Sequence, residues 1–394
     1  MQIPMAPISL DALFTARDAA QHIRQNKNRR VENTSPDSSL LIDSFSQEAD
    51  CAFIRLNTAG AHAKFKLHGH YTLQKPAAGG WLLVAMDASL PHYWMPREPA
   101  VRTLDAQGHI LTESAAALDD VNLGLDGLSV EFLAPEGLCL DAVIWRLNDA
   151  SLIGELQTLS PIEIQGRFLL GTHTRYGKPA DLYRHLIHGW VYEDRYAWPH
   201  KRRICSENDA HALHLVFSGL QRATGKRIYG LLKSQLLLSV LARQGEDGGF
   251  RHGEWTDNME SHYRLHCSAM HLMMDALSED DDPVVRSALA RGMTFISDKR
   301  DTTVAGAWFY HDELETSEAG MRRVPFKWWP GRALGKSPQN MLVLNTQLDT
   351  LVALERYRTL TGDTQYAPLV ESGYQAACAV LALRPMEWLY RLIY

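Results

Sequence analysis

Residues 208–243 read NDAHALHLVFSGLQRATGKRIYGLLKSQLLLSVLAR. On both sides of Thr224-Gly225 the apolar residues recur at the spacing of an amphipathic helix. The glycine suits the left-handed position that ends a helix, and Tyr229, four residues on, can pack back across the turn. The stretch therefore predicts an antiparallel hairpin of helices over residues 208–222 and 226–243.

The same arrangement returns further along the chain. Thr361-Gly362 separates two helical stretches, and Tyr366 again follows the glycine by four residues. Because the turn and both flanking patterns repeat, we expect a second hairpin of helices over residues 346–361 and 365–383.

A third hairpin is expected between these two, with helices over residues 258–277 and 283–296. Asp282 can cap the second of these helices, and Pro283 suits its first position. The acidic run that ends at Asp282 is explained by this helix start. One more helix is expected over residues 180–189.

Three long connectors, residues 190–207, 244–257 and 297–345, join the expected helical segments. Since successive helices alternate in direction, the short turns lie at one rim and these connectors at the other. Loops longer than about 12–15 residues in a compact domain are usually functional or disordered, and the Trp, Tyr, His and Arg residues of these connectors favour function. We therefore predict that the functional residues gather at the connector rim.

The earlier part of the chain has the period of two that strands show. In residues 63–73 apolar and polar side chains alternate, which is typical of a half-buried strand. Phe65, Leu67, Tyr71 and Leu73 share one face, and Lys64, Lys66, His68, His70 and Thr72 share the other. Apolar runs follow at 81–86, 128–133 and 140–147, and residues 157–164 are a last strand or a linker. An antiparallel sandwich is expected.

The predicted domains are a peripheral segment, 1–40, a β-rich domain, 41–168, and a helical domain, 169–394. A chain of 394 residues is long enough for two domains.

A net charge of −6 gives no general attraction to nucleic acid, and no apolar run is long enough to span a membrane. Five scattered cysteines without a CxxC pair indicate reduced thiols, so we expect a cytoplasmic protein. The oligomeric state is left open.

Two motifs carry a resemblance to known families. Residues 244–250, QGEDGGF, resemble the QxxDGGF/W element of α/α-toroid proteins such as terpenoid cyclases and prenyltransferase subunits. Residues 361–366, TGDTQY, are similar to hairpin turns of six-hairpin glycosidases and of the C-terminal domain of D-glucuronyl C5-epimerases. The resemblance covers about residues 170–394. It implies an α+β fold in which a β-sandwich-like domain precedes a toroid of helical hairpins, and a carbohydrate-active enzyme.

The candidate catalytic residues lie in residues 250–266, FRHGEWTDNMESHYRLH. Glycoside chemistry uses two carboxyl groups roughly 5–10 Å apart, and Glu254 and Asp257 are the candidates. Glu254 precedes the expected helix and is the first choice. Asp257 has an alternative role, because it and Glu260 have the spacing of a capping box.

His262 and Tyr263 complete the catalytic candidates. His262 shares a helix face with His266, but no HExxH pattern is present, so hydrogen bonding to substrate or core packing is expected rather than a metal site. Tyr263 could move a proton at a sugar carbon, as the resemblance to uronate epimerases implies; a half-buried helix tyrosine is the alternative. No cofactor is expected.

Aromatic and basic side chains in the connectors are the candidate substrate-binding groups. Aromatic rings stack on sugars, and guanidinium and ammonium groups suit an anionic glycan. The alternatives are a lid core for the aromatics and a solvated surface for the cations. The candidates are Tyr192, Trp198, His252, Trp255, Trp308, Arg322, Lys327, Trp328 and Trp329.

These patterns together predict a carbohydrate-active enzyme on an anionic, uronate- or phosphate-bearing polysaccharide or glycan. The reaction is hydrolysis, elimination or C5 epimerisation by acid–base chemistry, with a role in bacterial surface-polysaccharide metabolism. Two alternatives stay open: a non-catalytic glycan-binding or scaffold protein, and a terpenoid-cyclase-like enzyme, which needs an apolar, aromatic-lined cavity.

Overall fold

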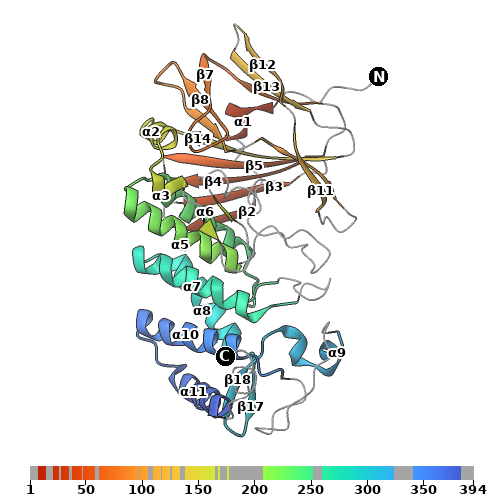
Figure 1. Cartoon of the computed structure of the whole chain (residues 1–394), viewed down its shortest axis with the longest axis vertical. Helices are drawn as coiled ribbons and strands as arrows, with labels where there is room; N and C mark the ends of the chain where they lie inside the picture. Colours follow the sequence, from red (N-terminus) through yellow and green to blue (C-terminus); the bar gives the residue numbers. More distant parts are fainter. Residues whose placement is uncertain are drawn as a thin grey trace, which may run out of the picture. The chain divides into compact units, whose positions relative to one another are not determined.

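The protein combines antiparallel sheets in its N-terminal region with helices in its C-terminal region (Figure 1). The computed structural model describes residues 8–14, 21–25, 28–34, 38–46, 48–57, 62–96, 98–104, 110–116, 118–124, 127–133, 138–164, 167–168, 175–176, 207–251, 260–323 and 340–382. Two compact units divide the described residues, one through Ala242 and one from Arg243 onward.

A large antiparallel sheet forms the centre of the first unit. Its strands, in spatial order, are β2 (Gln21–Gln25), β3 (Asn28–Thr34), β4 (Ser38–Phe45), β5 (Ala49–Asn57), β14 (Cys139–Leu147), β9 (His92–Met95), β8 (Trp81–Ala85) and β7 (Tyr71–Gln74). A branch of β10 (Ala100–Leu104) and β11 (Ile110–Ala115) joins it through β14.

A second sheet consists of β1 (Ile8–Ser9), β6 (His62–Leu67), β13 (Gly127–Leu133) and β12 (Leu118–Gly124). The pair β1–β6 is parallel and the other pairs are antiparallel. Both sheets contribute to one apolar core, in which Phe65 and Phe132 meet Ile54 and Ile144, and α1 (Leu10–Leu13) adds Leu10. Burial of these side chains is the main force that holds the sheets together.

The strand expected over residues 63–73 is two strands, β6 and β7, and they belong to different sheets. Gly69 separates them with a φ of 108°, a conformation that glycine adopts without strain. The expected faces are nevertheless found: Phe65, Leu67 and Tyr71 are buried, whereas Lys66 and His70 are exposed.

Several N-terminal elements differ from the sequence prediction. Residues 1–40, expected as a peripheral segment, contribute β1, α1, β2, β3 and the start of β4, because β3 pairs along β4. Residues 157–164 hold the end of α2 (Ser151–Gln157) and α3 (Pro161–Ile164) instead of a strand. Glu163 favours the helix, since its carboxylate accepts hydrogen bonds from the Ser160 N–H and hydroxyl.

The hairpin of α5 (Glu207–Thr224) and α6 (Ile228–Arg243) confirms the first predicted turn. Gly225 has a φ of 70°, and the Tyr229 ring stacks on Phe217 with centroids 6.2 Å apart. Lys226 forms an ion pair with Glu163 of α3, to which Tyr229 also donates a hydrogen bond. The hairpin thus belongs to the sheet-containing unit, and the predicted limit at residue 168 does not coincide with the division at Ala242.

The second unit contains two further hairpins, α7 (Tyr263–Glu279) with α8 (Pro283–Ser297), and α10 (Leu344–Thr361) with α11 (Ala367–Ala382). They lie side by side, with α7 against α10 (Figure 1). Asp282 caps α8 as predicted, accepting hydrogen bonds from the N–H groups of Val284 and Val285. Gly362 ends α10 with a φ of 75°, and Tyr366 packs on Tyr357.

Between α8 and α10 the chain forms the hairpin β17 (Arg300–Thr303) and β18 (Gly306–Phe309), the 3₁₀ helix η1 (Glu313–Thr316) and α9 (Glu318–Met321). In the first unit, β15 (Arg167–Phe168) pairs with β16 (Arg175–Tyr176). The predicted helix over residues 180–189 lies outside the described residues.

The helix predicted to begin at residue 258 begins at Tyr263, with His262 as its N-cap. The capping box of Asp257 and Glu260 is therefore wrong for this helix, because Glu260 precedes it. The physical reason is a β-bridge between His262 and Asp312, which keeps the backbone extended there. Asp257 itself lies outside the described residues.

The QGEDGGF motif fastens its loop to α8. The Gln244 side-chain amide donates hydrogen bonds to the carbonyl oxygens of Ala288 (2.8 Å) and Gly248 (3.0 Å). Gly248 has a φ of 86°, and a Cβ there would lie 2.5 Å from the Arg291 carbonyl oxygen. The motif therefore has a structural role at the end of α6.

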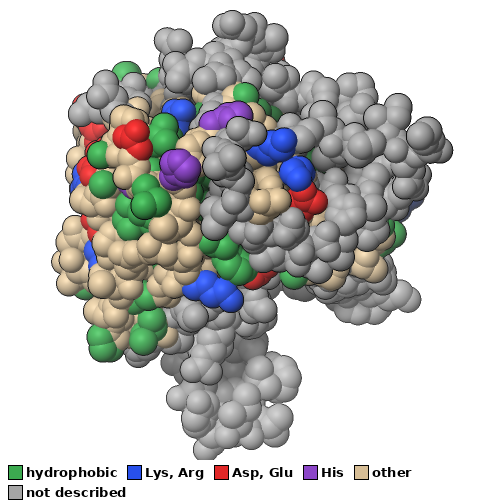
Figure 2. All heavy atoms as spheres, turned by 90° about the horizontal axis from the view of Figure 1, so that it is seen from above, with side chains coloured by type: hydrophobic (Ala, Val, Ile, Leu, Met, Phe, Trp, Pro, Cys, Tyr) green, Lys and Arg blue, Asp and Glu red, His purple; other side chains and the backbone are tan. Residues whose placement is uncertain are grey.

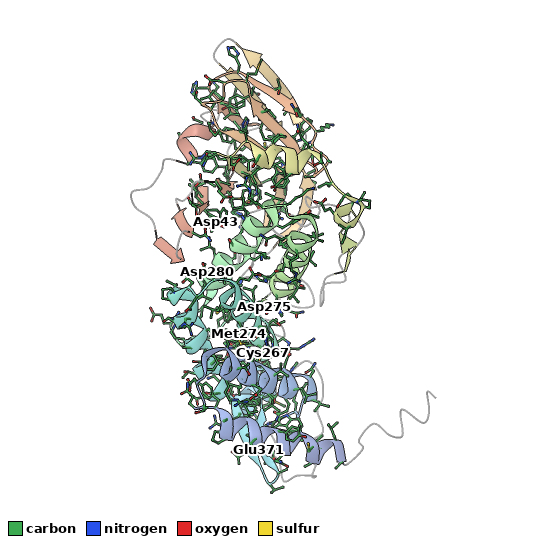
Figure 3. The ribbon with its side chains drawn as sticks, turned by 90° about the vertical axis from the view of Figure 1, so that its left-hand side faces the viewer. Asp43, Cys267, Met274, Asp275, Asp280 and Glu371 are labelled. Carbon is green, nitrogen blue, oxygen red and sulfur yellow. The ribbon has the colours of Figure 1, made fainter. Side chains whose placement is uncertain are left out.

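The buried face of α7 holds apolar side chains together with Tyr263, His266 and Cys267. Cys267 on α7 is buried with its sulfur 3.4 Å from the Thr350 hydroxyl of α10, and burial raises the pKa of its thiol to about 12 (Figure 3). On the face in Figure 2, basic, acidic and histidine side chains are interspersed with hydrophobic ones. Across the described ranges, no helix has both the length and the apolar character needed to cross a bilayer.

Candidate functional site

Two of the long connectors meet in the second unit. His262 forms an isolated antiparallel bridge with Asp312, the Tyr263 N–H donates to the His311 carbonyl (3.0 Å), and the Glu313 N–H donates to the Ser261 carbonyl (2.9 Å). We name residues 260–263 and 311–315 the connector junction. The gathering of all three connectors at one rim stays a prediction, because residues 190–206 and 252–259 lie outside the described residues.

The junction lies where β18 ends and α7 begins. Asp312 caps η1 through a hydrogen bond that its Oδ1 accepts from the Leu314 N–H (2.9 Å). Glu313 reaches the other connector, since its Oε2 accepts a hydrogen bond from the Ser261 N–H (2.9 Å). These local bonds fix two histidines and several carboxyl groups in a small, nearly buried volume.

His262 is held in one tautomer. Its side chain belongs to a residue only 7% exposed, and Nδ1 lies 3.1 Å from the His311 carbonyl oxygen. Because a carbonyl oxygen only accepts hydrogen bonds, Nδ1 carries the proton. In the neutral ring Nε2 then keeps its lone pair, so it is the nitrogen that can act as a base.

His311 packs edge-on against His262, with ring centroids 4.4 Å apart, and its Nδ1 contacts the Thr346 hydroxyl of α10. Burial, together with the charge of Arg264, lowers the pKa of His311 to about 4. His311 is therefore a neutral imidazole at physiological pH.

Asp312 has the opposite response to burial. Its side chain is fully buried, and Oδ2 lies 3.7 Å from Nδ1 of His262 with no hydrogen-bond partner in the described part of the chain. Burial, with repulsion from Glu260, Glu315 and Glu313, raises the pKa of Asp312 well above its usual range. A carboxyl group held in its protonated form can donate a proton.

Tyr263 and His266 point into the core. Tyr263 is fully buried against Phe295, and burial raises the pKa of its hydroxyl, with Glu313 and Asp312 adding to the effect. The tyrosinate form is therefore disfavoured. His266 is also fully buried, and its Nε2 lies 2.9 Å from the Gly292 carbonyl of α8.

Two predicted substrate-binding residues lie within the described structure. Trp308 is fully buried in β18, and Arg322 at the end of α9 is exposed, 3.5 Å from Glu318. The role of each stays a prediction. The remaining predicted site residues, Tyr192, Trp198, His252, Glu254, Trp255, Asp257, Lys327, Trp328 and Trp329, lie outside the described residues.

Arg264 places a positive charge beside the junction. It follows His262 by two residues, and its side chain is 38% exposed. Its Nε lies 4.0 Å from Asp349 Oδ2, which is beyond hydrogen-bond distance. The guanidinium group forms a long ion pair with Asp349 and remains partly exposed to solvent.

The arrangement suits proton transfer. It combines an imidazole nitrogen with a lone pair, an imidazole whose pKa is lowered and a carboxyl group whose pKa is raised, all with little exposure to water. Groups with perturbed pKa values that gather in one place are typical of acid–base sites. Within the described ranges, no three His, Cys, Asp or Glu side chains are grouped to hold a metal ion.

Sequence reasoning missed His311 and Asp312, which lie in a connector noted for its aromatic and basic residues. The available signal was local: the two residues precede an acidic turn, ELE. Nothing in the sequence paired that point with residue 262, because the bridge joins positions 50 residues apart.

Comparisons with known proteins find similarities among solved structures. No protein-family model matches the sequence, and no curated protein matches it. A solved structure described as a polysaccharide lyase is similar with a TM-score of 0.25 and 9% sequence identity, over 89% of this chain and 70% of that chain.

Proposed function

We propose that this chain is an enzyme that acts on an anionic, uronate- or phosphate-bearing polysaccharide or glycan, with the connector junction as its active site. The observation that carries the proposal is the pair His262 and Asp312. Nδ1 of His262 lies 3.7 Å from Oδ2 of Asp312, a carboxyl group whose pKa is raised by burial. The hydrogen bond from Nδ1 to the His311 carbonyl oxygen leaves Nε2 as the basic nitrogen.

The pair favours proton transfer at a sugar carbon over hydrolysis. In a uronate, the neighbouring carboxylate makes the C5 proton acidic, so Nε2 of His262 can remove it. Asp312 then returns a proton to the other face of C5, which gives epimerisation, or to the glycosidic oxygen at C4, which leaves as an alcohol while a C4–C5 double bond forms. Hydrolysis needs two carboxyl groups around the bond, a role that stays with Glu254 and Asp257 as a prediction.

Charge complementarity supports an anionic substrate. Arg264 lies beside the junction, and a guanidinium group can bind a carboxylate through two parallel hydrogen bonds. In the same proposal Arg322 and Lys327 bind further anionic groups, and the tryptophans stack on the sugars. The helical hairpins would form an α/α toroid, and the free thiols of Cys51, Cys139 and Cys267 suit the cytoplasm.

A turnover screen tests the proposal. The protein is incubated in D2O with polyglucuronate, polygalacturonate, alginate and a neutral glucan, and three products are followed: deuterium at C5, ultraviolet absorbance of a new double bond, and new reducing ends. We expect C5 exchange or the double bond with a uronate polymer only. His262→Gln and Asp312→Asn should each lower the rate by about 10²–10⁴.

His271→Gln is the matched control, because it makes the same substitution further along α7, where the ring contacts Arg356. It should keep the wild-type rate. Absence of all three products with every acidic polymer would refute the enzymatic proposal. Binding to a uronate polymer without any product would instead support the non-catalytic glycan-binding alternative.

A further inference from the structure

Glu315 is a buried carboxylate that joins two segments of main chain. It belongs to η1 and is fully buried. One carboxylate oxygen accepts a hydrogen bond from the His311 N–H (3.1 Å), and the other accepts one from the Met341 N–H (3.0 Å). Glu315 therefore binds the main chain of His311, shortly after β18, and that of Met341, shortly before α10, at the same time.

The main chain of His311 links Glu315 to the proposed base, His262. Its N–H is bound by Glu315, whereas its carbonyl oxygen accepts from the Tyr263 N–H and from Nδ1 of His262. The imidazole of His311 contacts Thr346 on α10. Any shift of this residue moves the acceptor that keeps the proton on Nδ1 of His262.

We infer that Glu315 is a positioning residue for His262. It binds the main chain of His311 and of Met341. It thereby holds the carbonyl oxygen that keeps the proton on Nδ1 of His262 and leaves Nε2 unprotonated. The inference rests on the proposed function for its consequence in catalysis, but its structural half stands by itself. Hydrogen bonds that orient a reactive imidazole commonly change activity by about 10–100-fold when removed, as at metal-bound histidines.

A carboxylate suits this buried position because its two oxygens can accept hydrogen bonds from two N–H groups. A charged acceptor makes shorter and stronger hydrogen bonds to N–H groups than a neutral one does. Glutamine in its place keeps the shape but offers one oxygen for two N–H donors, so one of the two would lose its acceptor. Glu315→Gln therefore loosens the connector without removing side-chain volume.

The test is nitrogen NMR of the intact protein labelled with ¹⁵N-histidine, with the His262 signal assigned by comparison with His262→Gln. In the wild type we expect a protonated Nδ1 and an unprotonated Nε2. In Glu315→Gln we expect a mixture of both tautomers. With the uronate polymer that the screen identifies, kcat should fall on the order of tenfold, with a shifted pH profile and little change in KM.

Glu313→Gln is the matched control. It makes the same substitution in the same 3₁₀ helix and weakens a bond to the Ser261 N–H, without touching His311. It should keep the single Nδ1–H tautomer of His262, which is the readout on which the two variants are compared. If Glu315→Gln does not fold, Glu315→Asp, which keeps the charge but has a shorter reach, is measured in the same way and should also give a mixture.

A single Nδ1–H tautomer of His262 in the folded Glu315 variant would overturn the inference. So would an equal loss of tautomer selection in Glu313→Gln, since the effect would then be general loosening of η1. Because the NMR measurement needs no substrate, a failed turnover screen refutes the proposed function and leaves the positioning role to be decided separately.

Discussion

His311 and Asp312 are neighbours in the chain, but burial moves their pKa values in opposite directions. It lowers the pKa of the imidazole and raises that of the carboxyl, because in each case the charged form loses its hydration. Folding therefore favours the neutral form of both groups. Each change has a consequence for stability that can be measured without knowing the substrate.

His311 should make the protein less stable as the pH falls. Its folded pKa, about 4, lies below the unfolded value of 6.5, so the unfolded chain binds more protons between these values. The free energy of unfolding should therefore decrease by about 2 kcal/mol between pH 7 and pH 5 through this residue. Urea unfolding at both pH values measures it, and His311→Gln should show a smaller decrease; an equal decrease in both proteins would contradict the assignment.

Asp312 should lower the stability at neutral pH. Its pKa is raised on folding, so the folded state keeps a proton that the unfolded chain releases, and stability is lost as the pH rises above 3.8 toward the folded pKa. Asp312→Asn removes this cost and keeps the cap oxygen. Its free energy of unfolding at pH 7 should exceed that of the wild type, although the proposed activity is lost. A less stable variant at pH 7 would contradict the protonated carboxyl.

At the scale of elements, two glycines with positive φ have different reasons to be glycine. Gly362 ends α10, and a Cβ there would have open space around it. Gly306 turns the β17–β18 hairpin against α11, and a Cβ there would lie 2.1 Å from the Ser372 carbonyl oxygen. The first position thus constrains the local backbone only, whereas the second fixes how closely a strand hairpin approaches a helix.

Alanine at each position separates these two causes. Gly362→Ala should cost about 1 kcal/mol, the usual penalty of a left-handed conformation for a residue with a Cβ. Gly306→Ala should cost at least about 2 kcal/mol more, because the hairpin must also move away from α11. Chemical denaturation of the two variants side by side gives the difference; equal costs would show that the contact with Ser372 is not tight in solution.

At the scale of the whole molecule, each compact unit has a buried polar group that its own fold depends on. In the first unit Asp141 is fully buried and binds both Arg55 and Arg102. In the second, the amide of Gln347 binds the Phe309 N–H and the carbonyl oxygens of Ala307 and Gly373. A substitution at either residue therefore tests the stability of the unit that contains it.

Calorimetry with Asp141→Asn and Gln347→Leu should resolve two unfolding transitions. Breaking the buried ion pairs of Asp141 should cost about 3–5 kcal/mol and lower one transition. Leaving the partners of Gln347 without hydrogen bonds should cost about 2–3 kcal/mol and lower the other. A single transition lowered by both variants would show that the units unfold as one.

Local patterns predicted most of the helical elements. The turns at Gly225 and Gly362 and the cap at Asp282 were found as expected, because backbone chirality and capping act within a few residues. The start of α7 was not, since the segment before Tyr263 pairs with residue 312, and this partner overrides the local capping signal.

The candidate site was predictable only in part. His262 and Tyr263 were singled out from a dense local segment, but the sequence gave them similar standing. The fold separates them: His262 lies at the junction with a defined tautomer, and Tyr263 is turned into the core with a raised pKa. His311, Asp312 and Glu315 had no comparable local signal, since each depends on a contact with a residue far along the chain.

The sequence by itself determined the periodicity of most strands and helices and the hairpin turns at Gly225, Asp282 and Gly362. These depend on the conformational preferences of a few consecutive residues. Only the tertiary structure decided which side chains meet, which are buried and which are protonated. Burial and long-range pairing set the pKa values and hydrogen-bond partners of His262, His311 and Asp312, and no stretch of neighbouring residues encodes them.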